Sequence, residues 1–182
     1  MTKNTSIKMI AILVTALLLV PFIASIVPGQ AAQDASTTIQ LGDFFFQGPE
    51  GKTGPFDQPE VNIATITGAS SGEIVITLQN NGKVEHEVLS PLFMLTNETS
   101  TVSFDSAGNQ VSRVETVGSL REVAIEPGLK TEITLSLDEA TFRSFEDDPN
   151  HALQFEIECF VGHGTSGDHY KLGMRGFITL KP

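Results

Sequence analysis

The residues of this chain with the clearest chemical potential lie close together near its C-terminal end. Cys159 is the only cysteine, and His163, His169 and Met174 follow it within 15 residues. Thiolate, imidazole and thioether groups are soft or borderline ligands, and sites that combine them are typical of copper. The alternative is a buried strand with an unreactive thiol, because free cysteine is among the most buried residue types. Residue types and spacing together favour a copper site.

A β-strand is expected to carry Cys159. In LQFEIEC, residues 153–159, apolar and polar residues alternate, and one face holds Leu153, Phe155, Ile157 and Cys159. Alternation with a period of two predicts a strand with one buried face. The glycine-rich stretch after Cys159 is expected to be a loop that returns to a last strand, GFITL.

The chain beyond Gln33 has the pattern of an all-β domain. TTIQLGDFFF, VNIATITG, EIVITLQ and KVEHEVLSP are short, often β-branched segments, and NNG and the Pro127-Gly128 pair are turn signals. Only SLDEATFRSF, residues 136–145, predicts a helix, with Ser136 or Asp138 as its N-cap. Seven or eight short strands separated by turns predict a β-sandwich or barrel.

The first 33 residues predict a targeting segment. Lys3 and Lys8 precede Met9–Val27, which is 19 residues without a charge. This pattern fits a secretory signal peptide, with a small-residue cleavage pattern at Gly29 and Ala31, and its length also fits an uncleaved membrane anchor. Positive charges before the apolar run keep the N-terminus inside. We therefore expect residues 1–33 to be a signal peptide or anchor and residues 37–182 to form an exported domain, which is periplasmic, extracellular or membrane-anchored on the outside.

The charge balance argues against a nucleic-acid partner. The chain has 22 acidic and 11 basic residues, whereas phosphate binding needs lysine and arginine. Lys3 and Lys8 belong to the leader, so the remainder has nine basic against 22 acidic residues, a formal charge of −13. An acidic surface keeps a domain soluble and can steer a cationic partner.

The ligand pattern resembles that of the cupredoxins, the type I blue copper proteins such as plastocyanin and azurin. In that family an early His follows an Asn/Gly turn, and the loop between the last two strands provides Cys, a second His and Met. His86 in NNGKVEHEV matches the early His, and His169 to Met174 matches the H-x4-M ending. The resemblance spans roughly residues 39–182. It implies a Greek-key β-sandwich or barrel of seven to eight strands with one short helix.

The resemblance also implies a ligand set for one copper ion. His86, Cys159 and His169 would be the strong ligands and Met174 the weak axial ligand. Small cupredoxins place two to four residues between the Cys and the loop His, whereas nine separate Cys159 from His169 and three separate it from His163. The H-x4-M spacing favours His169, and His163 stays the alternative loop ligand.

This sequence lacks the motifs that mark the enzymes of the cupredoxin family. Copper nitrite reductases have a His directly before the Cys, bridging to a second copper, and here Glu158 stands there. The H-x-H pairs of a trinuclear oxidase cluster are absent from the sequence. Many family members also have an Asn after the early His that contacts the sulfur, where this chain has Glu87. We therefore expect an electron carrier and not an enzyme.

The expected carrier cycles one copper between Cu(I) and Cu(II) and passes single electrons between redox proteins outside the cytoplasm. An exposed edge of His169, surrounded by Gly162, Gly164 and Leu172, is the expected electron port. The alternatives are a copper-binding or delivery protein of metal homeostasis and an accessory copper subunit of a respiratory oxidase or reductase complex. The apolar N-terminal run would attach the chain to a membrane if it is not cleaved.

Overall fold

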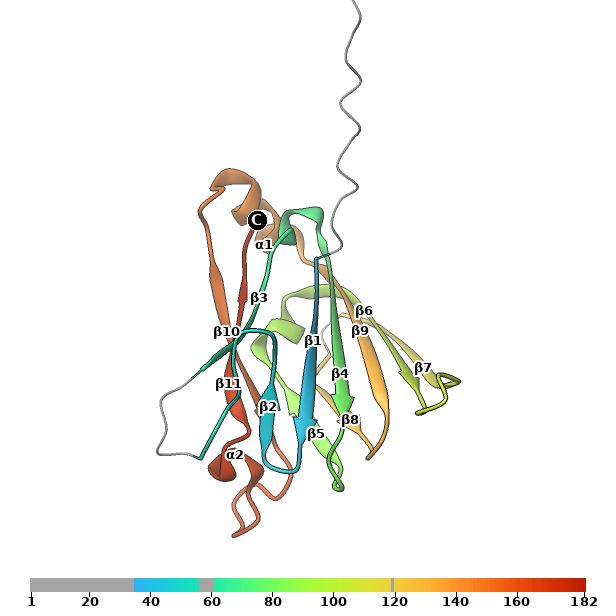
Figure 1. The fold of residues 1–182 in the computed structure, drawn as a ribbon. Helices are drawn as coiled ribbons and strands as arrows, with labels where there is room; N and C mark the ends of the chain where they lie inside the picture. Colours follow the sequence, from blue (N-terminus) through green and yellow to red (C-terminus); the bar gives the residue numbers. More distant parts are fainter. Residues whose placement is uncertain (1–34, 56–60, 119) are drawn as a thin grey trace, which may run out of the picture. The chain divides into compact units, whose positions relative to one another are not determined.

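Two β-sheets contain about half of the residues that the computed structural model describes, which are 35–55, 61–118 and 120–182 (Figure 1). The six-stranded sheet has the order β2-β1-β4-β9-β6-β7. Its strands are β1 Ala35–Gly42, β2 Phe45–Gln47, β4 Glu73–Asn80, β6 Thr96–Phe104, β7 Gln110–Val117 and β9 Lys130–Leu137. The five-stranded sheet has the order β3-β11-β10-β5-β8. Its strands are β3 Asn62–Ile66, β5 His86–Leu89, β8 Glu122–Ile125, β10 Leu153–Cys159 and β11 Arg175–Leu180.

The core lies between the inner faces of these sheets. Along β9 every second residue is buried, and β4 alternates in the same way. Burying each large aliphatic or aromatic side chain stabilises the fold by roughly 1.5–3 kcal/mol. The fully buried large side chains include Ile39, Leu41, Phe46, Ile63, Ile66, Ile74, Ile76, Leu78, Leu92, Phe93, Ile125 and Phe145. The predicted all-β, cupredoxin-like sandwich is confirmed.

The strand count differs from the prediction. The described residues form eleven strands, where the sequence indicated seven or eight. The hairpin of β6 and β7 was not predicted, because β7 is exposed along almost its whole length and therefore lacks an apolar–polar alternation. β2 has only three residues, which is too short to give a periodic signal, whereas β8 and β9 are the two short strands that the sequence predicts on either side of the Pro127-Gly128 turn.

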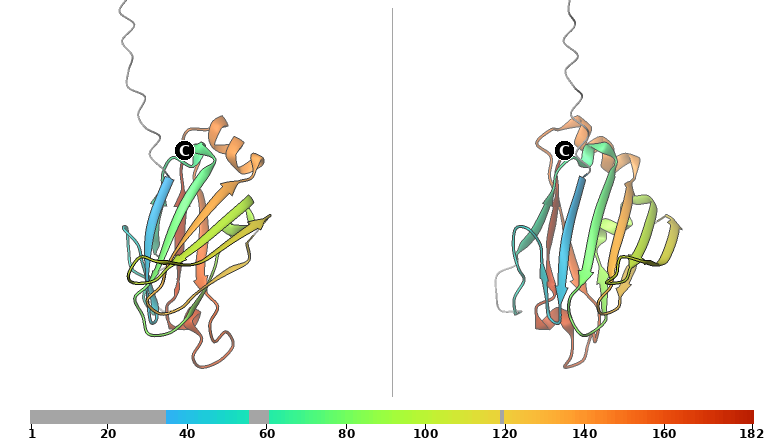
Figure 2. Two further views of the ribbon diagram at one scale, coloured as in Figure 1. Left: turned by 90° about the vertical axis from the view of Figure 1, so that its right-hand side faces the viewer. Right: turned by 45° about the vertical axis from the view of Figure 1, so that its right-hand side comes forward.

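Helices occupy a small part of the described chain. The predicted helix is present as α1, Glu139–Asp147, and its N-cap is Asp138, whose carboxylate accepts the Thr141 N–H at 2.7 Å. The stretch after Cys159 is not loop throughout, because α2 spans His169–Leu172. Two 3-10 turns, η1 Ala69–Ser71 and η2 Pro91–Met94, complete the elements. Figures 1 and 2 place α1 and α2 at opposite ends of the sandwich.

Strand direction gathers the predicted ligands at the α2 end. β10 runs antiparallel to both β5 and β11, so the end of β10 lies beside the starts of its two neighbours. Cys159 ends β10, His86 begins β5, and Met174 directly precedes β11. Segments far apart in sequence therefore meet at one edge of the five-stranded sheet.

The predicted leader, residues 1–33, lies outside the described residues. Within the part of the chain that is described, no helix has the length and apolar character needed to cross a membrane.

Candidate metal centre

Three predicted ligands converge in the interior of the domain. The Cys159 sulfur lies 3.6 Å from Nδ1 of His86 and 3.4 Å from Nδ1 of His169. One ligand atom from each residue lies within 4.8 Å of the other two. His86 and Cys159 are fully buried, and His169 is 5% exposed. Two imidazole nitrogens therefore face one sulfur in a space shielded from water.

Met174 is buried in the same region. Its N–H donates to the His169 carbonyl at 2.9 Å, and its carbonyl accepts the Cys159 N–H at 3.0 Å. These two bonds tie the backbone of Met174 to both of the other loop residues. The H-x4-M spacing thus corresponds to one turn of α2 followed by a return to β10.

His163 lies outside this group. Its side chain is 56% exposed, and its ring stacks on Phe160 with the centroids 4.5 Å apart. Its Nδ1 is 3.7 Å from an oxygen of the buried Asp168. Of the two loop histidines, His169 is therefore the one that the fold brings to Cys159 and His86.

Burial keeps the two converging imidazoles neutral. It lowers the pKa of His86 to about 4, with a further contribution from the nearby His169. Burial also lowers the pKa of His169. A neutral imidazole retains a lone pair, which is the form that binds a metal. Both rings are therefore ready to act as ligands at neutral pH without first losing a proton.

The cysteine needs the metal to ionise. Burial raises the pKa of the Cys159 thiol, and the peptide groups of Val161 and Glu87 oppose this by favouring the thiolate. Because a bound cation stabilises the thiolate, metal binding at this site should release the thiol proton.

The donor set fits copper. The two imidazoles and the thiol that converge, together with the buried Met174 whose backbone bonds to Cys159 and His169, match the ligand types of blue-copper sites. Nε2 of His86 is buried and has no hydrogen-bond partner among the described residues. The peptide group of Gly42 nevertheless raises the pKa of His86 slightly, against the larger effect of burial. The ring is thus held largely by packing, with Nδ1 directed toward the sulfur.

Sequence reasoning missed Phe44, which covers His169. Phe44 lies in the turn between β1 and β2, and its ring meets the His169 ring edge-on with centroids 5.3 Å apart. Phe44 is 45% exposed, whereas His169 is 5% exposed. His169 is therefore much less exposed than expected, because the ring of Phe44 packs against it and only a small part of the residue reaches the surface. The run of three Phe was visible in the sequence, but nothing local linked it to a histidine more than 100 residues away.

Asp168 is a second residue that the sequence analysis did not identify. It is 1% exposed and caps α2, accepting the Lys171 N–H at 3.3 Å and the Gly164 N–H at 3.0 Å. The Gly164 bond is the main cause that lowers the pKa of Asp168. An Asp directly before His169 is the available signal, since Asp is a preferred N-cap. The carboxylate joins the glycine-rich loop to the turn that begins with His169.

Replacing Asp168 by alanine should loosen this loop. We expect the melting temperature of the metal-free protein to fall by a few degrees, because both backbone N–H groups lose their acceptor. Asp168→Asn should lie between alanine and the wild type, because the two N–H groups bond to different carboxylate oxygens and the single amide oxygen can accept from only one of those two sides. Circular dichroism melting curves measure both variants. An alanine variant as stable as the wild type would show that the cap does not support this loop.

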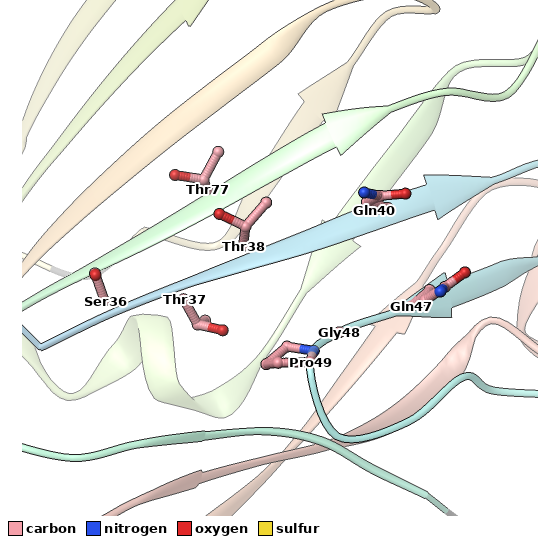
Figure 3. A pocket seen from close by; sticks show the side chains of 8 residues that line it. All are labelled: Ser36, Thr37, Thr38, Gln40, Gln47, Gly48, Pro49 and Thr77. Atoms are coloured by element: carbon pink, nitrogen blue, oxygen red, sulfur yellow. The ribbon is translucent and has the colours of Figure 1, made fainter.

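A separate hollow of about 470 Å³ lies on the six-stranded sheet (Figure 3). It is lined by Ser36, Thr37, Thr38, Gln40, Gln47, Gly48, Pro49 and Thr77. None of the four predicted metal ligands borders it. Its short, uncharged side chains give it no group that titrates or binds a metal strongly.

Comparisons with known proteins find similarity among solved structures alone. No protein family and no curated protein matches the chain. Among solved structures, the McoA multicopper oxidase from Aquifex aeolicus is 17% identical with a TM-score of 0.47, over 84% of this chain and 30% of the oxidase. A multicopper oxidase from Pseudomonas thermotolerans is 12% identical with a TM-score of 0.49, over 81% and 29%. One from Campylobacter jejuni, described as a metallo-oxidase, is 9% identical with a TM-score of 0.45, over 81% and 29%.

These neighbours correct one expectation. The sequence analysis expected an electron carrier and not an enzyme, and this is contradicted because the similar structures are multicopper oxidases, which are enzymes. The chain spans less than a third of the length of these three oxidases. The absence of H-x-H pairs therefore does not exclude an enzymatic role. At the coarse level, the chain contains a two-sheet β-sandwich with a buried His, Cys and His group that suits copper.

Proposed function

We propose that the domain binds one copper ion through His86, Cys159 and His169, with Met174 as a weak axial ligand, and passes single electrons outside the cytoplasm. The observation that carries the proposal is the approach of both histidine Nδ1 atoms to the Cys159 sulfur, at 3.6 and 3.4 Å in a buried space. Bound copper would supply a one-electron change between Cu(I) and Cu(II).

The β-sheet that holds the proposed ligands supports this role because it limits how far they can move. His86 and Cys159 lie on paired strands of one sheet, where Cys159 is in register with Val88. Met174 accepts the N–H of Cys159 on β10, and His169 is bonded to Met174 and to Val161, which lies just beyond β10. A site whose ligands are held in place has little to reorganise when its charge changes, which favours rapid electron transfer.

The surface over the site supports short-range contact with a redox protein. Phe44 packs on His169 and is 45% exposed, and Leu172 on α2 is 39% exposed. We infer that electrons enter or leave through Phe44 and the remaining exposed part of His169. The surplus of acidic residues would attract a cationic partner from a distance.

Copper titration tests the proposed stoichiometry. The purified chain should bind one Cu(II) and develop an intense blue or green colour from thiolate-to-copper charge transfer, and Cys159→Ser should remain nearly colourless. Elemental analysis together with visible spectroscopy measures both properties. Two copper ions per chain, or a colourless copper-loaded wild type, would contradict the proposal.

Further measurements separate the related roles. A reversible one-electron wave in voltammetry supports the carrier, whereas rapid loss of copper to a modest chelator supports a copper-delivery protein. Oxygen consumption by the copper-loaded chain, alone and with a respiratory complex, tests participation in an oxidase.

A further inference from the structure

The strand at one edge of the six-stranded sheet is long, and its outer side has no partner strand among the described residues. β7, Gln110–Val117, pairs with β6 on one side only, and seven of its eight residues are exposed. Figures 1 and 2 show it on the outer side of the sheet. It also carries exposed apolar side chains: Val111 is 53%, Val114 54% and Val117 93% exposed. A long, exposed edge with apolar residues is a template for pairing with another strand.

The other sheet edges are less suitable. β2, β3 and β8 have three, five and four residues. On β3, the side chains of Asn62 and Thr65 and the Thr65 N–H are bound to the Glu50 carboxylate. β7 is thus the longest edge strand in the described part of the chain.

The backbone of β7 has a defined outward-facing set of groups. The Gly118 N–H donates to the Asn97 carbonyl of β6 at 2.8 Å. Backbone groups of successive strand residues point to opposite sides, so those of Arg113, Glu115 and Val117 point away from β6. The register with β6 is regular from Ser112 to Val117, with a shift before Ser112. These outward N–H and C=O groups have the spacing that an antiparallel partner strand requires.

The sequence of β7 is complementary to itself in one antiparallel register. With a two-fold axis at Val114, Val114 of each copy faces its equivalent, and Arg113 of each copy faces Glu115 of the other. Ser112 then faces Thr116, and Val117 faces Val111. The outward backbone groups of Arg113 and Glu115 fall in hydrogen-bonded pairs, and Val114 falls in a non-hydrogen-bonded pair, as an antiparallel ladder requires.

We infer that two copies of this chain associate through β7, forming one continuous sheet across a two-fold axis. The charges carry this choice of partner, because each copy presents Arg113 and Glu115 in the order that its own copy complements. Within one chain these two side chains already pair at 2.6 Å and remain 59% and 43% exposed, so they can form a four-charge group across the axis. The metal ligands lie on or beside β5, β10 and β11 of the other sheet, so the pairing uses none of them.

Charge reversal on β7 tests the dimer. Sedimentation velocity is measured over a range of concentrations on the full chain, in a mild non-ionic detergent that keeps the apolar run Met9–Val27 from associating. The wild type should form a dimer. Arg113→Glu should raise the dimer dissociation constant at least about tenfold, because two opposite-charge pairs become two like-charge pairs. Glu115→Arg should have the same effect.

Mixing the two variants gives a sharper result. Arg113→Glu has glutamate at both positions and Glu115→Arg has arginine at both, so the two chains complement each other in the proposed register. An equimolar mixture should dimerise as the wild type does, and so should the double variant that exchanges both charges. Rescue of this kind does not follow from a variant that has merely lost its fold.

Arg143→Glu is the matched control. It breaks another exposed ion pair, with Glu139 on α1, and should leave dimerisation unchanged. A wild type that stays monomeric at its highest soluble concentration would overturn the inference and leave β7 open to a different protein. A dimer that Arg113→Glu does not weaken, or a mixture that does not recover, would also overturn it.

Discussion

Replacing His169 by alanine should abolish the intense visible absorption of the copper-loaded protein. His169 Nδ1 lies 3.4 Å from the Cys159 sulfur, so alanine removes one of two nitrogen ligands beside the thiolate. The absorption depends on overlap between the thiolate and a copper ion held in the plane of its strong ligands. We therefore expect loss of the band, and not a modest shift, in visible and circular dichroism spectra recorded at equal copper loading.

His163→Ala is the matched control for this prediction. His163 lies in the same loop, but its side chain is 56% exposed and lies against Phe160 and Asp168. Its removal should leave the band nearly unchanged. Loss of the band in His163→Ala and its survival in His169→Ala would assign the ligand role to the other histidine.

The metal-free protein should lose about 3 kcal/mol of its free energy of unfolding as the pH falls from 6.5 to 4, through His86 alone. His86 has an ordinary pKa of 6.5 in the unfolded chain and a pKa of about 4 in the folded protein. Between these values the unfolded chain holds a proton on this residue that the folded protein does not. Acid therefore favours unfolding in this window, and the stability is fully present only above pH 6.5.

The measurement is urea unfolding of the metal-free wild type and of His86→Gln across this pH range. His169, whose pKa is also lowered by burial, contributes with the same sign in both proteins, so the difference between the two curves isolates His86. The lowered pKa of Asp168 acts mainly below this window. Equal slopes for the two proteins would show that His86 is not held neutral by the fold.

The orientation of Cys159 and the class of metal followed from local sequence. Alternation along Leu153–Cys159 places the sulfur on the inner face, because side chains of a strand point to opposite sides in turn. Only four residues separate His169 from Met174. So short a segment keeps the two residues close together whatever the rest of the fold does. The all-β class followed from the same kind of short-range periodicity, and so did the cap at Asp138.

The β6 and β7 hairpin shows where that reasoning ends. Neither face of β7 is buried, so burial imposes no period on its sequence. Its role as an edge depends on which strand it pairs with and on what lies beyond it. Those properties belong to the assembled sheet, and a local pattern contains no information about them.

Tertiary structure brings His169, and not His163, close to Cys159 and His86, and it reveals what surrounds this group. His86 and Cys159 are 73 residues apart, and only the antiparallel pairing of β5 with β10 brings their side chains to 3.6 Å. The Asp168 cap turns His169 inward and leaves His163 outside, and Phe44 reaches His169 from the first strand pair. Glycines in a loop permit many paths, so spacing along the chain limits reach but not direction. Direction is determined by hydrogen bonds and packing between segments that are distant in sequence.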